Sequence, residues 1–306
     1  MDEILQQTLH GIDISGPVSH GLLHVFPLRG GTPEEDDLSL LEDGLRAGTL
    51  RVEGLQEAGC GQGLRVVNEG NSRVLILEGD ELAGAGQHRV ANSSVLIDAG
   101  SELALPVSCV ERGRWSYRSR AFFPATGSPH PSLRRLTSRP VHYSLRCGID
   151  RWNDRRAVWR DLGHVVRRYG TALPARALRA SRSHHAERLD AFEKLARELP
   201  EGTNGVVVAI GERLALLEIL AGPRTFARVF RKLLSGYAFE SVGLDRPYGT
   251  PEVSEVRDFI QTVAETAHGD HRAVGAGRDV RFEGDEISGY ALIGQKGVLH
   301  AAACAE

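Results

Sequence analysis

The stretch NGVVVAIGERLALLEIL, residues 204–220, holds two apolar runs on either side of Gly211. Short runs rich in Val, Ile and Leu, interrupted by a glycine, are typical of two strands joined by a tight turn. We therefore predict a strand pair over 204–220. The remaining carboxy-terminal elements are expected to assemble around this pair.

The tail DVRFEGDEISGYALIGQKGVLHAAACA, residues 279–305, has the pattern of two or three further strands. Its turns are expected at Gly284–Asp285 and Lys296–Gly297. A unit of two or three short strands is only marginally stable alone. We predict that the tail packs against 204–220 and against a helix over 251–267, which begins at Thr250–Pro251 and ends before Gly269.

The order of the remaining elements predicts an α+β fold, with a strand-rich amino-terminal half, a helical middle and a mixed carboxy-terminal part ending in short antiparallel strands. Region 1–123 is expected to be strand-rich and 124–306 helical and mixed, as one continuous domain. The periodicity of apolar residues predicts helices at 150–170, 183–199 and 222–237. The Pro- and Ser-rich stretch 124–148 is expected to form a long exposed loop.

Composition excludes several classes of protein. The chain of 306 residues carries a formal net charge of −3 and contains no apolar run long enough for a membrane helix. Its four cysteines show no CxxC spacing, which favours reduced thiols and a cytoplasmic location. Nucleic-acid binding is disfavoured because no recognisable module and no strong positive charge accompany the arginine-rich middle. The sequence leaves a homo-oligomer open.

The stretch LEGDELAGAGQHR, residues 77–89, concentrates acids and glycines between two strand-like segments. It matches only half of the dinucleotide fingerprint, and a strand rather than a helix is expected after Gly86, which excludes a phosphate cradle. Solvated turn residues are the simpler interpretation of its acids, and a divalent cation such as magnesium is the alternative. A second copy, EGDEISG, occupies 283–289, and we expect the carboxylates of Glu81 and Glu286 to lie more than about 8 Å apart.

The second polar stretch is SCVERGRWSYRSR, residues 108–120. Arginine can hold an anion through two parallel hydrogen bonds while an aromatic ring stacks on a planar group, which indicates Arg114 and Trp115 as ligand contacts. Cys109 beside Glu111 is a candidate nucleophile with a neighbouring acid, although a buried cysteine more commonly acts as a small hydrophobe. Histidines such as His300 are expected to be structural, and the sequence contains no self-evident catalytic triad.

Five segments occur in the order RVLILEGDELAGAGQHR, LPVSCVERGRW, NGVVVAIGERL, FRKLLSGYAFESV and GVLHAA. In this order they resemble a bacterial family, the ADP-ribosylglycohydrolase- and rhodanese-phosphatase-associated protein domain of type one. The resemblance runs from about residue 10 to the end of the chain. The matching positions in its two most specific blocks are Glu78, Glu81, Gly84, Gly86, Gln87, Arg89, Cys109, Glu111, Arg114 and Trp115. His88 departs from the asparagine expected there.

Two functional hypotheses follow. In the first, one pocket binds or hydrolyses a small anionic ligand, with catalytic carboxylates from Glu78, Glu81 and Glu111 and ligand contacts from Gln87, Arg89, Arg114 and Trp115. The family's name implies a connection to ADP-ribose or NAD metabolism but no particular activity. In the second, the protein is a non-catalytic structural or assembly protein, and the same residues form a buried polar network. Whether the protein is an enzyme, and whether it holds a metal, stays open at this point.

Overall fold

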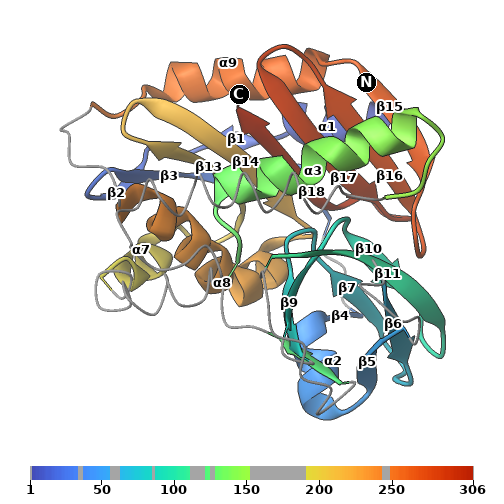
Figure 1. Ribbon diagram of the computed structural model, residues 1–306. Coiled ribbons are helices and arrows are strands. Elements are labelled where there is room, and N and C mark those ends of the chain that lie inside the picture. The colour runs from blue at the N-terminus through green and yellow to red at the C-terminus, as the bar shows by residue number, and fades with distance from the viewer. Residues whose placement is uncertain are drawn as a thin grey trace.

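The computed structural model describes residues 2–33, 37–55, 63–84, 87–110, 121–124, 128–151, 191–242 and 249–305, with only the backbone at residue 87. The described residues form an α+β fold, as predicted. A large antiparallel sheet lies between two layers of helices, and a smaller strand-rich part lies beyond one helical layer (Figure 1). No helix within these ranges is long and apolar enough to cross a membrane.

The large sheet is built around the hairpin of β13 (Thr203–Ile210) and β14 (Arg213–Leu220), which confirms the predicted strand pair. Gly211 makes the turn with a φ of 62°, a left-handed conformation that glycine adopts without steric cost. The sheet order is β1-β3-β13-β14-β18-β17-β16-β15, with β2 paired to β3. The amino-terminal strands in this sheet are β1 (Asp13–Ile14), β2 (Val18–His20) and β3 (Leu23–Arg29).

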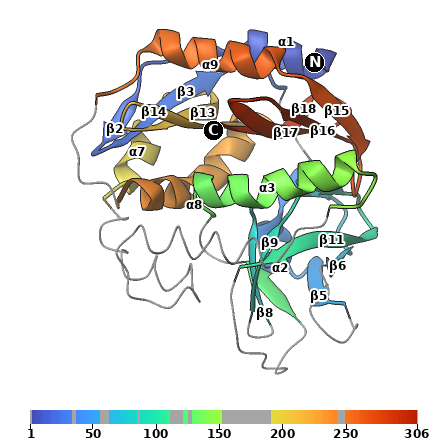
Figure 2. The same ribbon diagram turned by 45° about the horizontal axis from the view of Figure 1, so that its top comes forward.

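The tail strands pack where the sequence predicts. They are β15 (His268–Arg272), β16 (Arg278–Glu283), β17 (Ile287–Ile293) and β18 (Val298–Ala305). Strand β18 pairs with β14, with Leu216 opposite Cys304. Helix α9 (Val253–Glu265) and helix α1 (Glu3–His10) cover one face of the sheet, where Val256 and Val263 share a core with Ala301 and Ala303 (Figure 2).

The opposite face of the sheet is covered by three helices: α3 (Pro131–Arg146), α7 (Glu193–Glu198) and α8 (Pro223–Val242). Val206 and Val208 pack against α8, whereas Val207 faces α9, because successive side chains of a strand alternate between faces. Helix α8 confirms the helix predicted at 222–237. The helix predicted at 150–170 lies mostly outside the described residues, and only α7 is described from the one predicted at 183–199.

The smaller part is barrel-like and has its own apolar core, formed by residues such as Leu50, Val66, Ile76 and Leu105. One of its sheets has the order β12-β8-β9-β11-β6-β5 and the other β10-β7-β4. The strands are β4 (Leu38–Leu40), β5 (Leu50–Gly54), β6 (Gly63–Asn68), β7 (Arg73–Ile76), β8 (Glu81–Gly84), β9 (Gln87–Ala91), β10 (Val95–Ile97), β11 (Glu102–Cys109) and β12 (Phe122–Pro124), with helix α2 (Leu41–Ala47) beside them.

The prediction of an exposed loop at 124–148 is wrong, because helix α3 occupies most of this stretch and is largely buried on one side. Pro131 stands in the first turn, where its missing N–H group costs nothing. The buried stripe includes Arg134, Ser138 and His142 at intervals of four residues, the spacing of one helix face. These polar side chains share the buried face with Leu133 and Val141, so the hydrophobic periodicity of the helix is diluted.

Candidate functional site

Residues 77–80 form a tight bend between β7 and β8. The acids of this bend and of the first residue of β8 are buried, so the interpretation as solvated turn residues is wrong. Glu78, Asp80 and Glu81 are 3%, 3% and 4% exposed. Gly79 has a φ of 92°, and the Leu77 N–H donates to Asp80 Oδ2 at 2.9 Å, which closes the bend. Strand β9 begins at Gln87, so no helix receives a phosphate after Gly86.

Asp80 is fixed by an ion pair with helix α8. Lys232 Nζ lies 2.6 Å from Asp80 Oδ1 and 2.5 Å from Glu42 Oε1. Burial disfavours the ammonium charge, but Asp80 and Glu42 together hold the pKa of Lys232 above its ordinary value. The bend is therefore anchored to both α2 and α8.

Glu78 is the exceptional acid of this bend. Arg281 Nη2 lies 3.1 Å from Glu78 Oε2, yet within the described residues neither carboxylate oxygen has a hydrogen bond of acceptable geometry. Burial raises the pKa of Glu78 to about 7, and the positive charges of Arg281 and Arg134 and the nearby Ser138 hydroxyl only partly oppose this effect. A buried polar group without a hydrogen bond is rare in native proteins and is a candidate functional group.

Arg281 compensates the negative charge of Glu78 only in part, because its guanidinium also binds other side chains. Its Nε donates to Asp279 Oδ1 at 2.7 Å, and its Nη2 donates to Ser93 Oγ at 2.8 Å. Asp279 also accepts from Arg151 Nε and Nη2, at 3.0 and 2.9 Å. Although burial opposes ionisation, Arg281 and Arg151 hold the pKa of Asp279 below its ordinary value.

A second group of buried charges surrounds Glu218, in the middle of β14. Arg134 Nη2 donates to Glu218 Oε1 at 2.9 Å, Arg134 Nη1 and the Tyr237 hydroxyl both donate to Oε2, and His300 Nε2 lies 2.7 Å from Oε1. Arg134 Nη2 also donates to the Tyr290 hydroxyl at 2.7 Å. Burial alone would raise the pKa of Glu218, but Arg134 and His300 hold it far below its ordinary value.

Ser94 links the barrel-like part to this group. Its Oγ lies 2.6 Å from His300 Nδ1 and accepts the Glu78 N–H at 2.9 Å. Burial lowers the pKa of His300, and Glu218 opposes the shift, so the balance favours the neutral ring. We call the whole set the buried polar centre: Glu78, Ser94, Arg134, Glu218, Asp279, Arg281, Tyr290 and His300.

Of the residues predicted from the sequence, the structure describes the side chains of Glu78, Glu81, Arg89 and Cys109. Glu78 belongs to the buried polar centre. Glu81 and Arg89 lie on the adjacent strands β8 and β9, and Cys109 lies opposite Arg89 on β11. The structure describes only the backbone of Gln87. Outside the described residues are Glu111, Arg114 and Trp115.

Most of the buried polar centre was missed by reasoning from the sequence. Glu218 interrupts the apolar run LALLEIL, Arg281 stands in VRF, and His300 stands in VLHAAACA. A charged residue in the middle of an apolar strand is costly to bury unless it is paired, and this signal was available in the sequence. The partners on α3 do not emerge from the sequence, because the Pro- and Ser-rich composition of 124–148 predicts a loop there.

The two EGDE segments have different surroundings, as expected. Glu78 and Glu81 are buried, whereas Asp285 and Glu286 lie in the exposed turn between β16 and β17. The strand that leads into the second copy nevertheless reaches the first, through the contact between Arg281 and Glu78. Among the residues the structure describes, no three His, Cys, Asp or Glu side chains are grouped as a metal site requires.

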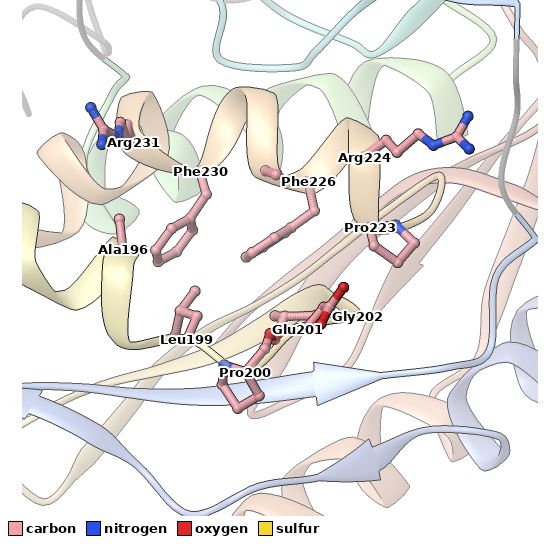
Figure 3. Close-up of a pocket in the computed structure, with 12 residues that line it drawn as sticks. Ala196, Leu199, Pro200, Glu201, Gly202, Pro223, Arg224, Phe226, Phe230 and Arg231 are labelled. Carbon is pink, nitrogen blue, oxygen red and sulfur yellow. Dashed lines mark hydrogen bonds between the residues drawn. The ribbon is translucent and has the colours of Figure 1, made fainter.

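A separate hollow lies at the start of α8. Its residues are distant along the sequence from Glu78, Asp80 and Glu81. It has a volume of about 350 Å³, and the stacked rings of Phe226 and Phe230, 4.8 Å apart, point toward Leu199 and Pro200 (Figure 3). None of the residues predicted from the sequence lines this hollow.

Comparison with known proteins identifies the family. No curated protein and no solved structure matches the chain. Residues 11–304 match the ARG and Rhodanese-Phosphatase-superfamily-associated Protein domain, which confirms the resemblance seen in the sequence. Because this match covers nearly the whole chain, the protein belongs to that family, ARPP-1.

Proposed function

We propose that the protein binds or hydrolytically processes a small anionic ligand, related to a nucleotide or to ADP-ribose, next to the buried polar centre. The observation that carries this proposal is the carboxylate of Glu78, which is buried beside Arg281 without a hydrogen bond in the described part of the chain. The other charged groups of the centre are paired in the core, so Glu78 has the greatest capacity to interact with a ligand.

The chemistry of Glu78 suits acid–base catalysis. Burial raises its pKa to about 7, so both the acid and the carboxylate are populated near neutral pH. A group in that condition can take a proton from water and return it to a leaving group. Arg281 supplies positive charge beside it for an anionic substrate.

The nature of the ligand is proposed from the sequence and the family. Arg114 and Trp115 are the proposed anion and stacking contacts, from the segment 111–120. The family's name associates it with ARG and rhodanese–phosphatase proteins, which supports ADP-ribose or NAD metabolism as the context. The absence of CxxC spacing among the cysteines supports a cytoplasmic location.

Thermal shift measurements with ADP-ribose, NAD and related nucleotides, with and without magnesium, test the proposal. A ligand that binds only the folded state stabilises it, by about 2.7 kcal/mol at a concentration of 100 Kd. We expect a shift for the wild type and its loss in Arg114→Ala, whereas Glu286→Gln, in the exposed turn, keeps the shift. A wild type that shifts with none of these ligands contradicts the proposal.

The second candidate is a non-catalytic structural or assembly protein, and the saturated contacts of Glu218 favour it. This carboxylate accepts hydrogen bonds from Arg134, Tyr237 and His300, so it is fully committed to holding helices and strands together. An assembly role predicts a homo-oligomer, and the mass of the protein in solution tests this. A monomer at micromolar concentration argues against the assembly role.

A further inference from the structure

The structure assigns Ser94 as a nucleophile, with His300 as its base and Glu218 as the residue that positions that base. The inference rests on the proposed ligand site and deepens it, by naming an acyl ester of an anionic molecule as the substrate class and His300, in place of Glu78, as the base that activates water. It is carried by the hydrogen-bonded series Ser94 Oγ, His300 Nδ1, His300 Nε2 and Glu218 Oε1, with separations of 2.6 and 2.7 Å at its two hydrogen bonds.

The direction of each hydrogen bond follows from the chemistry of the groups. An ionised carboxylate only accepts, so His300 Nε2 carries the hydrogen and donates to Glu218. The neutral ring then has its lone pair on Nδ1, which accepts from the Ser94 hydroxyl. The remaining Ser94 lone pair accepts the Glu78 N–H at 2.9 Å, so no donor or acceptor conflicts with this arrangement.

The positions of the two partners are fixed by the sheet. Leu220 lies opposite His300 in the pairing of β14 with β18, and Glu218 is two residues earlier on the same face. Glu218 is also held by Arg134 and Tyr237, so its carboxylate cannot rotate away from His300. This is the arrangement of a nucleophile, a base and a third group that orients the base, which is recognised by geometry and not by sequence.

Arg134 and Glu218 also determine the charge states that proton transfer from Ser94 to His300 requires. The guanidinium keeps Glu218 ionised, and an ionised carboxylate stabilises the imidazolium that forms when His300 takes a proton. Burial and the charge of Arg134 lower the pKa of the ring against the opposing effect of Glu218, which favours the neutral form that can accept that proton.

The reaction balances with water as the second substrate. The Ser94 Oγ forms a bond to the carbonyl carbon of the ester while its proton passes to His300 Nδ1. The alcohol departs with that proton, and the acyl group stays on Ser94. Water then attacks the acyl carbon through the same base, which releases the acid and restores the hydroxyl of Ser94. The Glu78 N–H donates to Ser94 Oγ and so helps to fix the position of the hydroxyl.

Labelling with serine-directed reagents tests the assignment without any knowledge of the natural substrate. The folded protein is incubated with a fluorophosphonate and with the smaller methanesulfonyl fluoride, and the adduct is measured by intact mass and located by peptide mapping. We expect one adduct, on Ser94. Ser94→Ala should lose it, and His300→Gln should slow it by on the order of a hundredfold or more.

Ser108→Ala is the matched control, because Ser108 is a buried serine that donates to Asn92 Oδ1 and lies outside the hydrogen-bonded series. We expect the Ser108→Ala variant to be labelled on Ser94 at the wild-type rate. If Ser94→Ala or His300→Gln fails to fold, the position of the adduct in the wild-type protein tests the assignment of Ser94 by itself. A wild type labelled only elsewhere, or by neither reagent, overturns the assignment. Labelling at Ser94 without any nucleotide-induced thermal shift would instead overturn the proposed ligand and leave the nucleophile standing.

Discussion

Among single residues, the stability of Glu81→Gln shows whether Glu81 is a buried structural group or a solvated catalytic group. It is 4% exposed in the barrel-like part, so Glu81→Gln should destabilise the fold by about 1–3 kcal/mol, the cost of disturbing a buried polar group. The measurement is urea unfolding at neutral pH. Glu286→Gln is the matched control, because Glu286 occupies the equivalent position of the exposed EGDE copy and should change stability by less than about 0.5 kcal/mol. Equal, small effects would show that Glu81 is not a buried structural group.

The cysteines provide a second prediction at this scale. Cys109 and Cys304 are buried, and burial raises the pKa of Cys304 to about 12, whereas Cys147 is exposed after α3. Since the thiolate is the reactive form, we expect iodoacetamide to alkylate Cys147 in the native protein and to spare Cys109 and Cys304. Peptide mapping after a timed reaction measures this. Rapid alkylation of Cys109 would restore the interpretation of that residue as a nucleophile.

At the scale of elements, helix α3 docks on the sheet through a charge pair. Arg134 is 2% exposed and pairs with Glu218, so Arg134→Met leaves a buried carboxylate without its main counterion. We expect a loss of about 3–5 kcal/mol in unfolding free energy, which is typical when one partner of a buried pair is removed. Tyr143→Ala, at a position 70% exposed on the same helix, serves as the control and should have little effect. An equally small effect of Arg134→Met would mean that the pair does not hold α3 in place.

The same helix shows how far the sequence could predict the elements. Strands β13, β14 and β18 and helices α8 and α9 were predicted because their apolar residues follow the strand or helix period. Helix α3 was missed because polar Arg134, Ser138 and His142 share its buried face with Leu133 and Val141, and because its Pro and Ser residues are typical of a loop. Glu78 could be named as a site residue from the sequence, but Ser94, Glu218 and His300 come together only through pairing between distant strands.

At the scale of the whole molecule, the buried polar centre joins the barrel-like part to the large sheet. Ser94 reaches His300, Glu78 reaches Arg281, and Leu96 forms an isolated bridge with Ala276. These contacts connect segments separated by about two thirds of the chain. A ligand that altered the charge of Glu78 would therefore act on the contact between the two parts of the fold.

The pH dependence of stability in the wild type and in Glu78→Gln tests most directly whether Glu78 is the incompletely compensated carboxyl group on which the proposed function rests. The pKa of Glu78 is about 7 in the folded protein against an ordinary value of 4.5. The folded state thus binds this proton more tightly. The contribution of Glu78 to stability is complete below pH 4.5 and is lost as the pH rises through 7.

Urea unfolding of both proteins between pH 4.5 and pH 8 measures this contribution as a difference, in which the other titrating groups cancel. We predict that the unfolding free energy of Glu78→Gln rises relative to that of the wild type, by about 3 kcal/mol between pH 4.5 and pH 8. The reason is that a buried carboxylate, which becomes charged over this range, has been replaced by a neutral amide. A variant that is less stable than the wild type at pH 8, with a difference that grows as Glu78 ionises, would show that Glu78 is a structural ion-pair partner of Arg281 and would contradict the account.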